Sequence, residues 1–306
     1  MPDRLSGLEV FVHAIRDGGI SAAARTLRMS PAMAAKHLDA LERRLGVTLV
    51  RRSTRRLSLT EAGQQLMPEV ERLLAGLAEA ENSASNSAVT ISGLLRVSVP
   101  VSFGILHVAP LVPAFTQRNP HIIIELGLND RYVDLMEENW DVALRIGRLA
   151  DSALIARKLA PIKAVICGSP AYLKKRGVPR TLADLSKHDC LGYTLAPSVG
   201  TKTWSFGHDG KVQVPVSGSL HANNGEALVS AAIAGQGLVY GPEFIVARAL
   251  ATKRLIKVAL DKPPIDLGGV HAVTHPDRRP TAKSRAWIEY LYSALARLRA
   301  NASDAL

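Results

Sequence analysis

Residues 22–60 read AAARTLRMSPAMAAKHLDALERRLGVTLVRRSTRRLSLT, and this stretch decides the fold of the N-terminal part of the chain. Its three leading alanines are strong helix formers, and Ser21 is expected to cap the helix that they begin. A short turn then leads to Ser30 and Pro31, a second cap with proline at the first helical position. The pattern therefore predicts two short helices joined by a tight turn.

The second of these helices is expected to have two different faces. Apolar residues recur at helical spacing and predict a buried face made of Ala34, Leu38, Leu41 and Leu45. The opposite face has few large side chains near its start, as in a recognition helix that enters a DNA major groove. A solvated helix in any small bundle is the alternative. We predict DNA contacts from Ser30, Ala32, Met33, Ala35, Lys36 and His37, with a contribution from thymine methyl groups and DNA shape.

A run of arginines follows this helix and favours the DNA interpretation. Arg51, Arg52, Arg55 and Arg56 surround Ser53 and Thr54 between two short apolar segments, which predicts a β-hairpin with guanidinium groups at its tip. On a merely structural hairpin these charges would repel one another without an anionic partner. Such a wing reaches phosphates or a minor groove. We predict DNA contacts from Arg52, Ser53, Thr54, Arg55 and Arg56.

Charge is concentrated in the same region. The 306-residue chain carries a net charge of +11, which favours a polyanionic partner. Residues 1–60 contain 11 Lys and Arg against 5 Asp and Glu, whereas residues 61–90 contain 1 against 5. The N-terminus lacks the apolar run of a signal peptide, and no stretch approaches the roughly 18–20 apolar residues of a membrane span. We therefore expect a cytoplasmic protein without membrane contact.

Residues 8–63, which add an amphipathic helix before the two described, resemble the winged helix-turn-helix of the LysR-type transcriptional regulators. The resemblance rests on the alanine run, the segment LERRLG, the arginine-rich wing and the closing LTEAG. Many members have a polar residue after the capping serine and a serine–arginine pair one turn later. Here those positions are Pro31, Ala35 and Lys36, of which Lys36 keeps the charge. The resemblance implies a tetramer built from two dimers that bends its promoter.

Residues 61–90 are expected to form a linker helix and a hinge. Apolar and small residues follow a 4-3-4-3 spacing at Leu66, Val70, Leu73, Leu77, Ala80, Ala84 and Ser87. Such a heptad seam suits the pairing of two long helices. We therefore predict a homodimer through residues 61–88, as the resemblance also implies. A single helix that packs on its own C-terminal domain is the alternative.

From residue 93 onward, strand and helix patterns alternate. Strands are expected near residues 95–99, 122–126, 141–146, 163–167, 204–206, 212–214, 238–242 and 270–273, and helices include residues 130–138 and 284–298. This order predicts a mainly parallel sheet with helices on both faces. The predicted fold class is α/β with a winged N-terminal part, divided into residues 1–60, 61–90 and 91–306. Lobe I is expected at about 91–162 and 267–306, and lobe II at about 163–266.

Two such lobes joined by two crossings form a cleft of the periplasmic-binding-protein kind, where ligands sit at the carboxyl ends of strands. The LysR resemblance implies a small, often carboxylate-bearing co-inducer there, and no other cofactor is expected. We predict effector contacts from loops that follow strands or open helices: Ser102, Phe103, Arg145, Ser198, Thr201, Asn223 and Gly225. As alternatives, Ser102 and Asn223 are only helix caps, and Arg145 pairs with a local acid.

Motifs of catalysis are missing from the sequence. We find no GxSxG, P-loop, GxGxxG or HExxH pattern. The neighbouring His188 and Asp189 are a poor basis for a proton relay, and Cys167 and Cys190 lack metal-ligand spacing, which predicts two small apolar core residues. A stand-alone solute-binding protein would need a signal peptide. We therefore predict a DNA-binding transcription regulator, not an enzyme, whose promoter binding responds to an organic acid.

Overall fold

The computed structural model describes residues 4–52, 57–84, 91–149, 154–196, 198–275, 280–296 and 298. For residues 52, 75 and 78–84 it describes the backbone alone. The chain divides into two compact units, Met1–Val89 and Thr90–Leu306, each with a core of its own. Within the described residues, no helix has the length and apolar character needed to cross a membrane.

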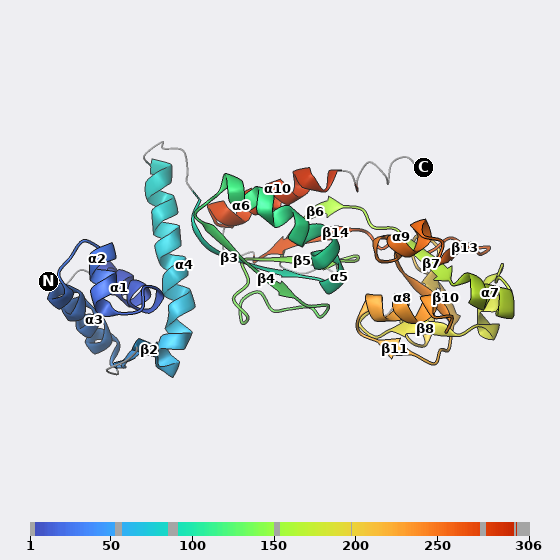
Figure 1. Ribbon diagram of the computed structural model, residues 1–306, viewed down its shortest axis with the longest axis horizontal. Helices are drawn as coiled ribbons and strands as arrows, with labels where there is room; N and C mark the ends of the chain where they lie inside the picture. The colour runs from blue at the N-terminus through green and yellow to red at the C-terminus, as the bar shows by residue number, and fades with distance from the viewer. Residues whose placement is uncertain are drawn as a thin grey trace. The chain divides into compact units, whose positions relative to one another are not determined.

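The first unit is a winged helix-turn-helix followed by a long helix (Figure 1). Its elements are α1 (Arg4–Arg16), α2 (Ile20–Thr26), α3 (Pro31–Leu45), β1 (Val50–Arg52), β2 (Leu57–Leu59) and α4 (Glu61–Ala84). The strands β1 and β2 pair antiparallel, with Arg51 opposite Ser58. Phe11 of α1 and Leu38 of α3 are fully buried in the core that these elements share.

Local signals set the ends of α3, whereas α2 differs from the sequence prediction. The Ser30 hydroxyl accepts the Met33 N–H at 3.2 Å, and Gly46 ends α3 with a left-handed φ of 70°. The helix α2 begins at Ile20, so Ser21 lies in its first turn and does not cap it. The preceding Gly19 is the cap residue and makes no side-chain bond there.

Part of the apolar surface of α4 packs within its own unit. Leu66, Val70 and Leu74 pack against the helix-turn-helix core, and Arg16 of α1 pairs with Glu71 at 2.8 Å. Leu73, in contrast, is 54% exposed. More than half of this apolar residue is therefore left uncovered by the described residues of this unit.

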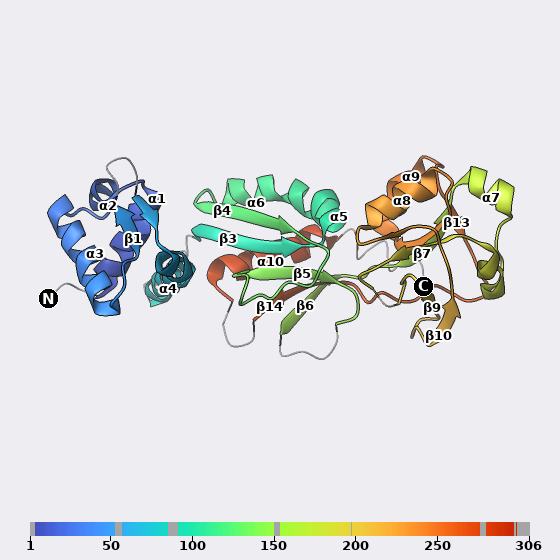
Figure 2. The same cartoon turned by 90° about the horizontal axis from the view of Figure 1, so that it is seen from below.

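Lobe I of the second unit is a five-stranded sheet in the order β4-β3-β5-β14-β6 (Figure 2). Its strands are β3 (Gly93–Val99), β4 (Ile122–Leu128), β5 (Val142–Ile146), β6 (Ile155–Ala160) and β14 (Val270–Thr274). Between β3 and β4 runs a helical segment made of α5 (Val101–Phe103), η1 (Gly104–Val108), η2 (Ala109–Leu111) and α6 (Val112–Arg118). The helix α10 (Ala282–Ala294) completes this lobe.

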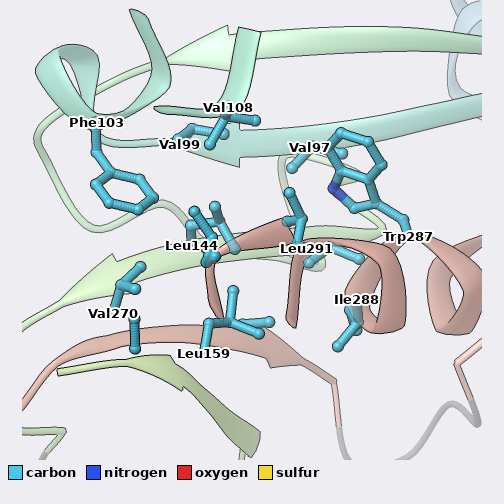
Figure 3. Close-up of a cluster of buried hydrophobic side chains, with 14 of the residues drawn as sticks. Val97, Val99, Phe103, Val108, Leu144, Leu159, Val270, Trp287, Ile288 and Leu291 are labelled. Carbon is cyan, nitrogen blue, oxygen red and sulfur yellow. The ribbon is translucent and has the colours of Figure 1, made fainter. Parts of the chain in front are cut away.

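One face of this sheet is covered by α6 and α10. Trp287 and Leu291 of α10 point toward Val97 and Leu144 on the strands (Figure 3). The Trp287 ring also meets Phe115 of α6 edge-on, with centroids 4.9 Å apart. Because side chains alternate along a strand, the residues between these buried ones face the opposite side of the sheet.

Lobe II has a sheet of the same size in the order β11-β8-β12-β7-β13. Its strands are β7 (Ala164–Gly168), β8 (Cys190–Tyr193), β11 (His221–Ala222), β12 (Leu238–Pro242) and β13 (Ile256–Val258), beside a hairpin of β9 (Thr203–Phe206) and β10 (Val212–Pro215). The helices are α7 (Pro170–Arg176), η3 (Leu182–Lys187), α8 (Gly225–Ile233) and α9 (Glu243–Ala251). Cys167 and Cys190 are buried free thiols, and burial raises the pKa of each to about 12.

Two sequence predictions in this unit are wrong in detail. Each five-stranded sheet is mixed, because strands that follow a crossing between lobes run antiparallel to their neighbours, as β14 does beside β5. Residues 130–138 form a loop and turn in place of a helix. There the Asp134 carboxylate accepts the N–H groups of Met136 and Glu137 at 2.7 and 3.0 Å, and such local bonds compete with a helical ladder.

Candidate functional site

The outward face of α3 is small and mostly apolar at its start. Ala32, Met33 and Lys36 are exposed, with Met33 at 52%, whereas Ala35 is half-buried. Ala34, Leu38 and Leu41 on the other face are buried. The exposed face therefore offers one ammonium group, a thioether and methyl groups to a partner, together with the Ser30 hydroxyl that already accepts a backbone N–H.

The remaining predicted DNA contacts differ in how well they are placed. His37 is half-buried, and its Nδ1 atom is enclosed without a hydrogen-bond partner. The wing strands are present, but Ser53, Thr54, Arg55 and Arg56 lie outside the described residues, and Arg52 is described by its backbone alone. Glu42 of α3 holds the base of the wing, because its Oε1 accepts the N–H groups of Leu49 and Val50 at 2.7 and 3.1 Å.

A cavity of about 450 Å³ lies between the two lobes. From lobe I it is lined by Ser98, Ala143 and Arg145, which alternate with buried core residues and so share the second face of the sheet. From lobe II it is lined by residues that include Leu228, Val239, Phe244 and Val246. The walls are mainly apolar with a few polar groups, which is the usual composition of a small-molecule site.

Of the cations that line this cavity, Arg145 has no acidic partner within the part of the chain that the structure describes. Its Nη2 donates to the Val133 carbonyl at 3.2 Å, and its guanidinium carbon lies 4.9 Å from the centre of the Tyr132 ring. Its Nε is buried without an acceptor. Among the described residues, no carboxylate forms an ion pair with Arg145. The guanidinium therefore retains the capacity to bind an anion.

The two other arginines that line the cavity are already paired. Arg131 donates to both oxygens of Glu138 at 2.7 Å, and chiefly for this reason the pKa of Glu138 falls to about 2. Arg148 donates to the Asp266 carbonyl at 3.1 Å and lies 3.8 Å from the Asp266 carboxylate. Arg145 thus differs from its neighbours in having no carboxylate of its own.

Of the residues predicted to contact an effector, most line this cavity. They are Ser102, Phe103, Arg145, Ser198 and Gly225. Ser102 is 4% exposed, and its hydroxyl makes no hydrogen bond within the described residues. Thr201 and Asn223 do not line the cavity. Asn224 caps α8, since its Oδ1 accepts the N–H groups of Glu226 and Ala227.

Sequence reasoning missed several polar residues of the cavity, among them Asp130 and Tyr193. Asp130 follows β4, and Tyr193 ends β8, so the rule that ligands gather after strands applied to both. Burial raises the pKa of Tyr193, with a smaller effect from Asp130 and Tyr132.

The neighbouring His188 and Asp189 make separate contacts in the structure. The His188 Nδ1 lies 3.1 Å from the Tyr172 hydroxyl, and Asp189 instead accepts the Ser219 N–H at 3.0 Å. The two neighbours therefore do not form a relay. Within the same residues, no three His, Cys, Asp or Glu side chains gather as metal ligands.

Two family models match the chain and together span nearly all of it. Residues 5–64 match the bacterial regulatory helix-turn-helix protein of the lysR family, and residues 89–296 match the LysR substrate-binding domain. The chain belongs to the LysR family of transcriptional regulators. Both matched domains are those of regulators, which confirms the prediction of a DNA-binding transcription regulator and not an enzyme.

Known relatives of this LysR-family chain agree with that assignment. An uncharacterized HTH-type transcriptional regulator of Haemophilus influenzae is 34% identical over 90% of this chain and 95% of that protein. The HTH-type transcriptional regulator CrgA of Neisseria meningitidis is 33% identical over 94% of this chain and 96% of its own length. The solved structure of CrgA covers 95% of this chain and 98% of its own, with a TM-score of 0.59.

Proposed function

We propose that this LysR-family regulator binds double-stranded DNA as a homodimer and that a small organic acid in the cavity between its lobes modulates this binding. Arg145 carries the effector part of the proposal, because it places a cation without a carboxylate partner in a mainly apolar cavity. In such surroundings a cation is stabilised by an anion that accepts hydrogen bonds from its free N–H groups. The Ser102 hydroxyl supplies a further polar contact.

The DNA part of the proposal places the start of α3 in a major groove and the wing on the adjacent backbone or minor groove. Lys36 contacts a phosphate or a guanine edge, and Met33 with Ala32 contacts thymine methyl groups. Exposure of these three side chains supports this arrangement. Arg52, Ser53, Thr54, Arg55 and Arg56 add contacts from the wing, and Ser30, Ala35 and His37 complete the face.

The dimer forms through residues 61–88, and two dimers assemble into a tetramer. The exposed Leu73 on the long α4 supports the dimer contact. Two-fold symmetry then relates two half-sites on the DNA. An effector changes this assembly only to the extent that it binds one arrangement of the protein better than another.

Replacement of Arg145 tests the effector site. Small organic acids are first screened against the wild-type protein by thermal shift, and the binding of each active acid is then measured by calorimetry. We expect Arg145→Gln to weaken that binding by roughly 10- to 100-fold, because a hydrogen bond to a charged group contributes about 1.5–3 kcal/mol. Arg118→Gln, which removes an exposed arginine of α6 outside the cavity, is the matched control.

Equal affinity of the acid for wild type and Arg145→Gln would refute the assignment of Arg145. The melting temperature of each variant is measured alongside, since Arg145 also contacts Val133 and Tyr132. A variant that melts like the wild type but no longer binds the acid supports a direct contact.

Base substitution in the DNA tests whether Met33 contacts thymine methyl groups. A duplex is selected by the protein from a random-sequence pool, and each thymine is then replaced by uracil, which removes the C5 methyl group alone. At the contacted positions we expect a roughly fourfold loss of affinity, equivalent to about 0.8 kcal/mol for one buried methyl-sized group. Met33→Ala should reduce that loss at the same positions, whereas Lys36→Ala should leave it unchanged. A duplex that tolerates uracil everywhere would contradict methyl readout.

A further inference from the structure

One carboxylate connects the two lobes across the edge of the cavity. Asp130 lies in the loop after β4 of lobe I, and its Oδ1 accepts the Val101 N–H at 2.9 Å. Its Oδ2 accepts a hydrogen from the Asn224 side-chain amide of lobe II at 3.1 Å. Each oxygen of this single side chain therefore bonds to a different lobe.

The partner in lobe II is held in one orientation. The Asn224 Oδ1 accepts the N–H groups of Glu226 and Ala227 at 3.1 and 3.2 Å and so caps α8. Because the amide oxygen is used by these donors, the NH₂ group must face away from the helix. In this structure it faces Asp130, so the direction of the inter-lobe bond is fixed by the cap.

The hydrogen bond from Asn224 helps to stabilise the negative charge of the Asp130 carboxylate. Among the described residues, no Lys, Arg or His forms an ion pair with Asp130. Its negative charge is therefore met by the N–H groups of Val101 and Asn224. Tyr193 of lobe II is half-buried near the same carboxylate, and both residues line the cavity. Separation of the lobes would remove the Asn224 donor from Asp130.

We infer that Asp130 and Asn224 are positioning residues that form a latch and hold the two lobes around the cavity before any effector binds. A hydrogen bond to a charged group changes an equilibrium constant by roughly 10- to 100-fold, so the latch favours the closed arrangement by a factor of that order. A second consequence rests on the proposed function. The carboxylate of an organic acid is repelled by Asp130 and therefore lies toward Arg145.

A pair of substitutions separates the latch from the helix cap. In Asn224→Asp, aspartate caps a helix as well as asparagine does, so α8 keeps its start. The new carboxylate, however, faces Asp130 and breaks the latch by repulsion. The double variant Asp130→Asn with Asn224→Asp restores it, because the amide at 130 donates to the carboxylate at 224 and its oxygen still accepts the Val101 N–H. All the hydrogen bonds are thus remade, with one direction reversed.

The test measures the distance between the lobes in the full chain without effector or DNA. Spin labels are attached at Gln117→Cys on α6 and Lys175→Cys on α7, two exposed positions, while the native Cys167 and Cys190 are buried. We expect one main distance in the wild type, a population of longer distances at least tenfold larger in Asn224→Asp, and a return to the wild-type distribution in the double variant.

An unchanged distribution in Asn224→Asp would overturn the latch, and so would a double variant that stays open. Because no effector is present, this result is independent of whether Arg145 binds an organic acid. Failure of the latch and failure of the proposed effector site are therefore distinguished by separate measurements.

Discussion

A Leu73→Asp variant is expected to be monomeric in light scattering and to bind its selected DNA roughly 100- to 10,000-fold more weakly than the wild type. Leu73 is 54% exposed on α4, so an aspartate there disturbs no core within its own unit. In a dimer, however, the carboxylate would enter an apolar helix–helix seam without a partner. Loss of the second copy removes the gain in affinity that comes from linking two binding modules.

The control for this variant is Gln64→Asp. Gln64 is exposed on the same helix and lies on the side opposite Leu73 at 100° per residue. The Gln64→Asp substitution is expected to leave the protein dimeric and its affinity for DNA unchanged. A Leu73→Asp protein that remains a dimer would remove α4 from the interface and return it to the alternative of a helix that packs within its own chain.

The second large effect is expected from Gly63→Ala, in the LTEAG segment at the start of α4. A Cβ atom at this position would lie 2.1 Å from the Leu49 carbonyl oxygen. That oxygen cannot easily move, because it accepts the Thr60 N–H at 2.9 Å. The first turn of α4 must therefore shift away from the wing base. We expect a loss of about 1–3 kcal/mol in the free energy of unfolding of the first unit.

The same substitution at Gly76 provides a matched control with the opposite sign. Gly76 lies in α4 too, but nothing approaches within 4 Å of its added Cβ. Alanine there is expected to stabilise the helix by about 0.5–1 kcal/mol. The difference between the two variants isolates the close approach at Gly63 from the helix propensity of alanine.

Two optical signals separate the units in this experiment. The three tryptophans, Trp140, Trp204 and Trp287, all lie in the second unit, whereas circular dichroism reports helices of both. In denaturant, Gly63→Ala should shift the circular dichroism transition of the first unit and leave the tryptophan fluorescence transition in place. If Gly63→Ala unfolds like the wild type by both signals, the predicted clash with the Leu49 carbonyl oxygen is contradicted.

The helix-turn-helix was predictable from sequence because its signals are local. The cap at Ser30, the proline after it and the left-handed Gly46 all act within one or two turns of α3. At the start of α2 the local rule failed by two residues, since Gly19 takes the cap position that the sequence assigned to Ser21. The alanines remain helical in either case, so the fold is unaffected.

Strand pairing in the second unit was harder to predict. The sequence analysis gave no strand at Ile155–Ala160, where Arg157 and Lys158 interrupt the apolar pattern. This segment is the edge strand β6, and edge strands tolerate charged side chains because one side is unpaired. Sheet order and direction depend on residues far apart in sequence, so the mixed sheets did not follow from local patterns.

The residues that line the cavity were likewise only partly predictable from local sequence patterns. The rule that ligand contacts follow strands led to Ser102, Arg145 and Ser198, which do line it. It did not predict that Arg131 and Arg148 would be neutralised by Glu138 and Asp266, leaving Arg145 unpaired. Nor did it find the bond between Asp130 and Asn224, which joins residues 94 positions apart.

The most direct test of the account measures DNA affinity as a function of organic acid concentration. The full chain is titrated onto its selected two-half-site duplex, with and without each acid that binds the wild-type protein. We predict that at least one acid changes the affinity or the footprint, and that Arg145→Gln binds the same duplex but does not respond to that acid. If acids bound in the cavity leave both affinity and footprint unchanged, the protein is not a regulator controlled through this site.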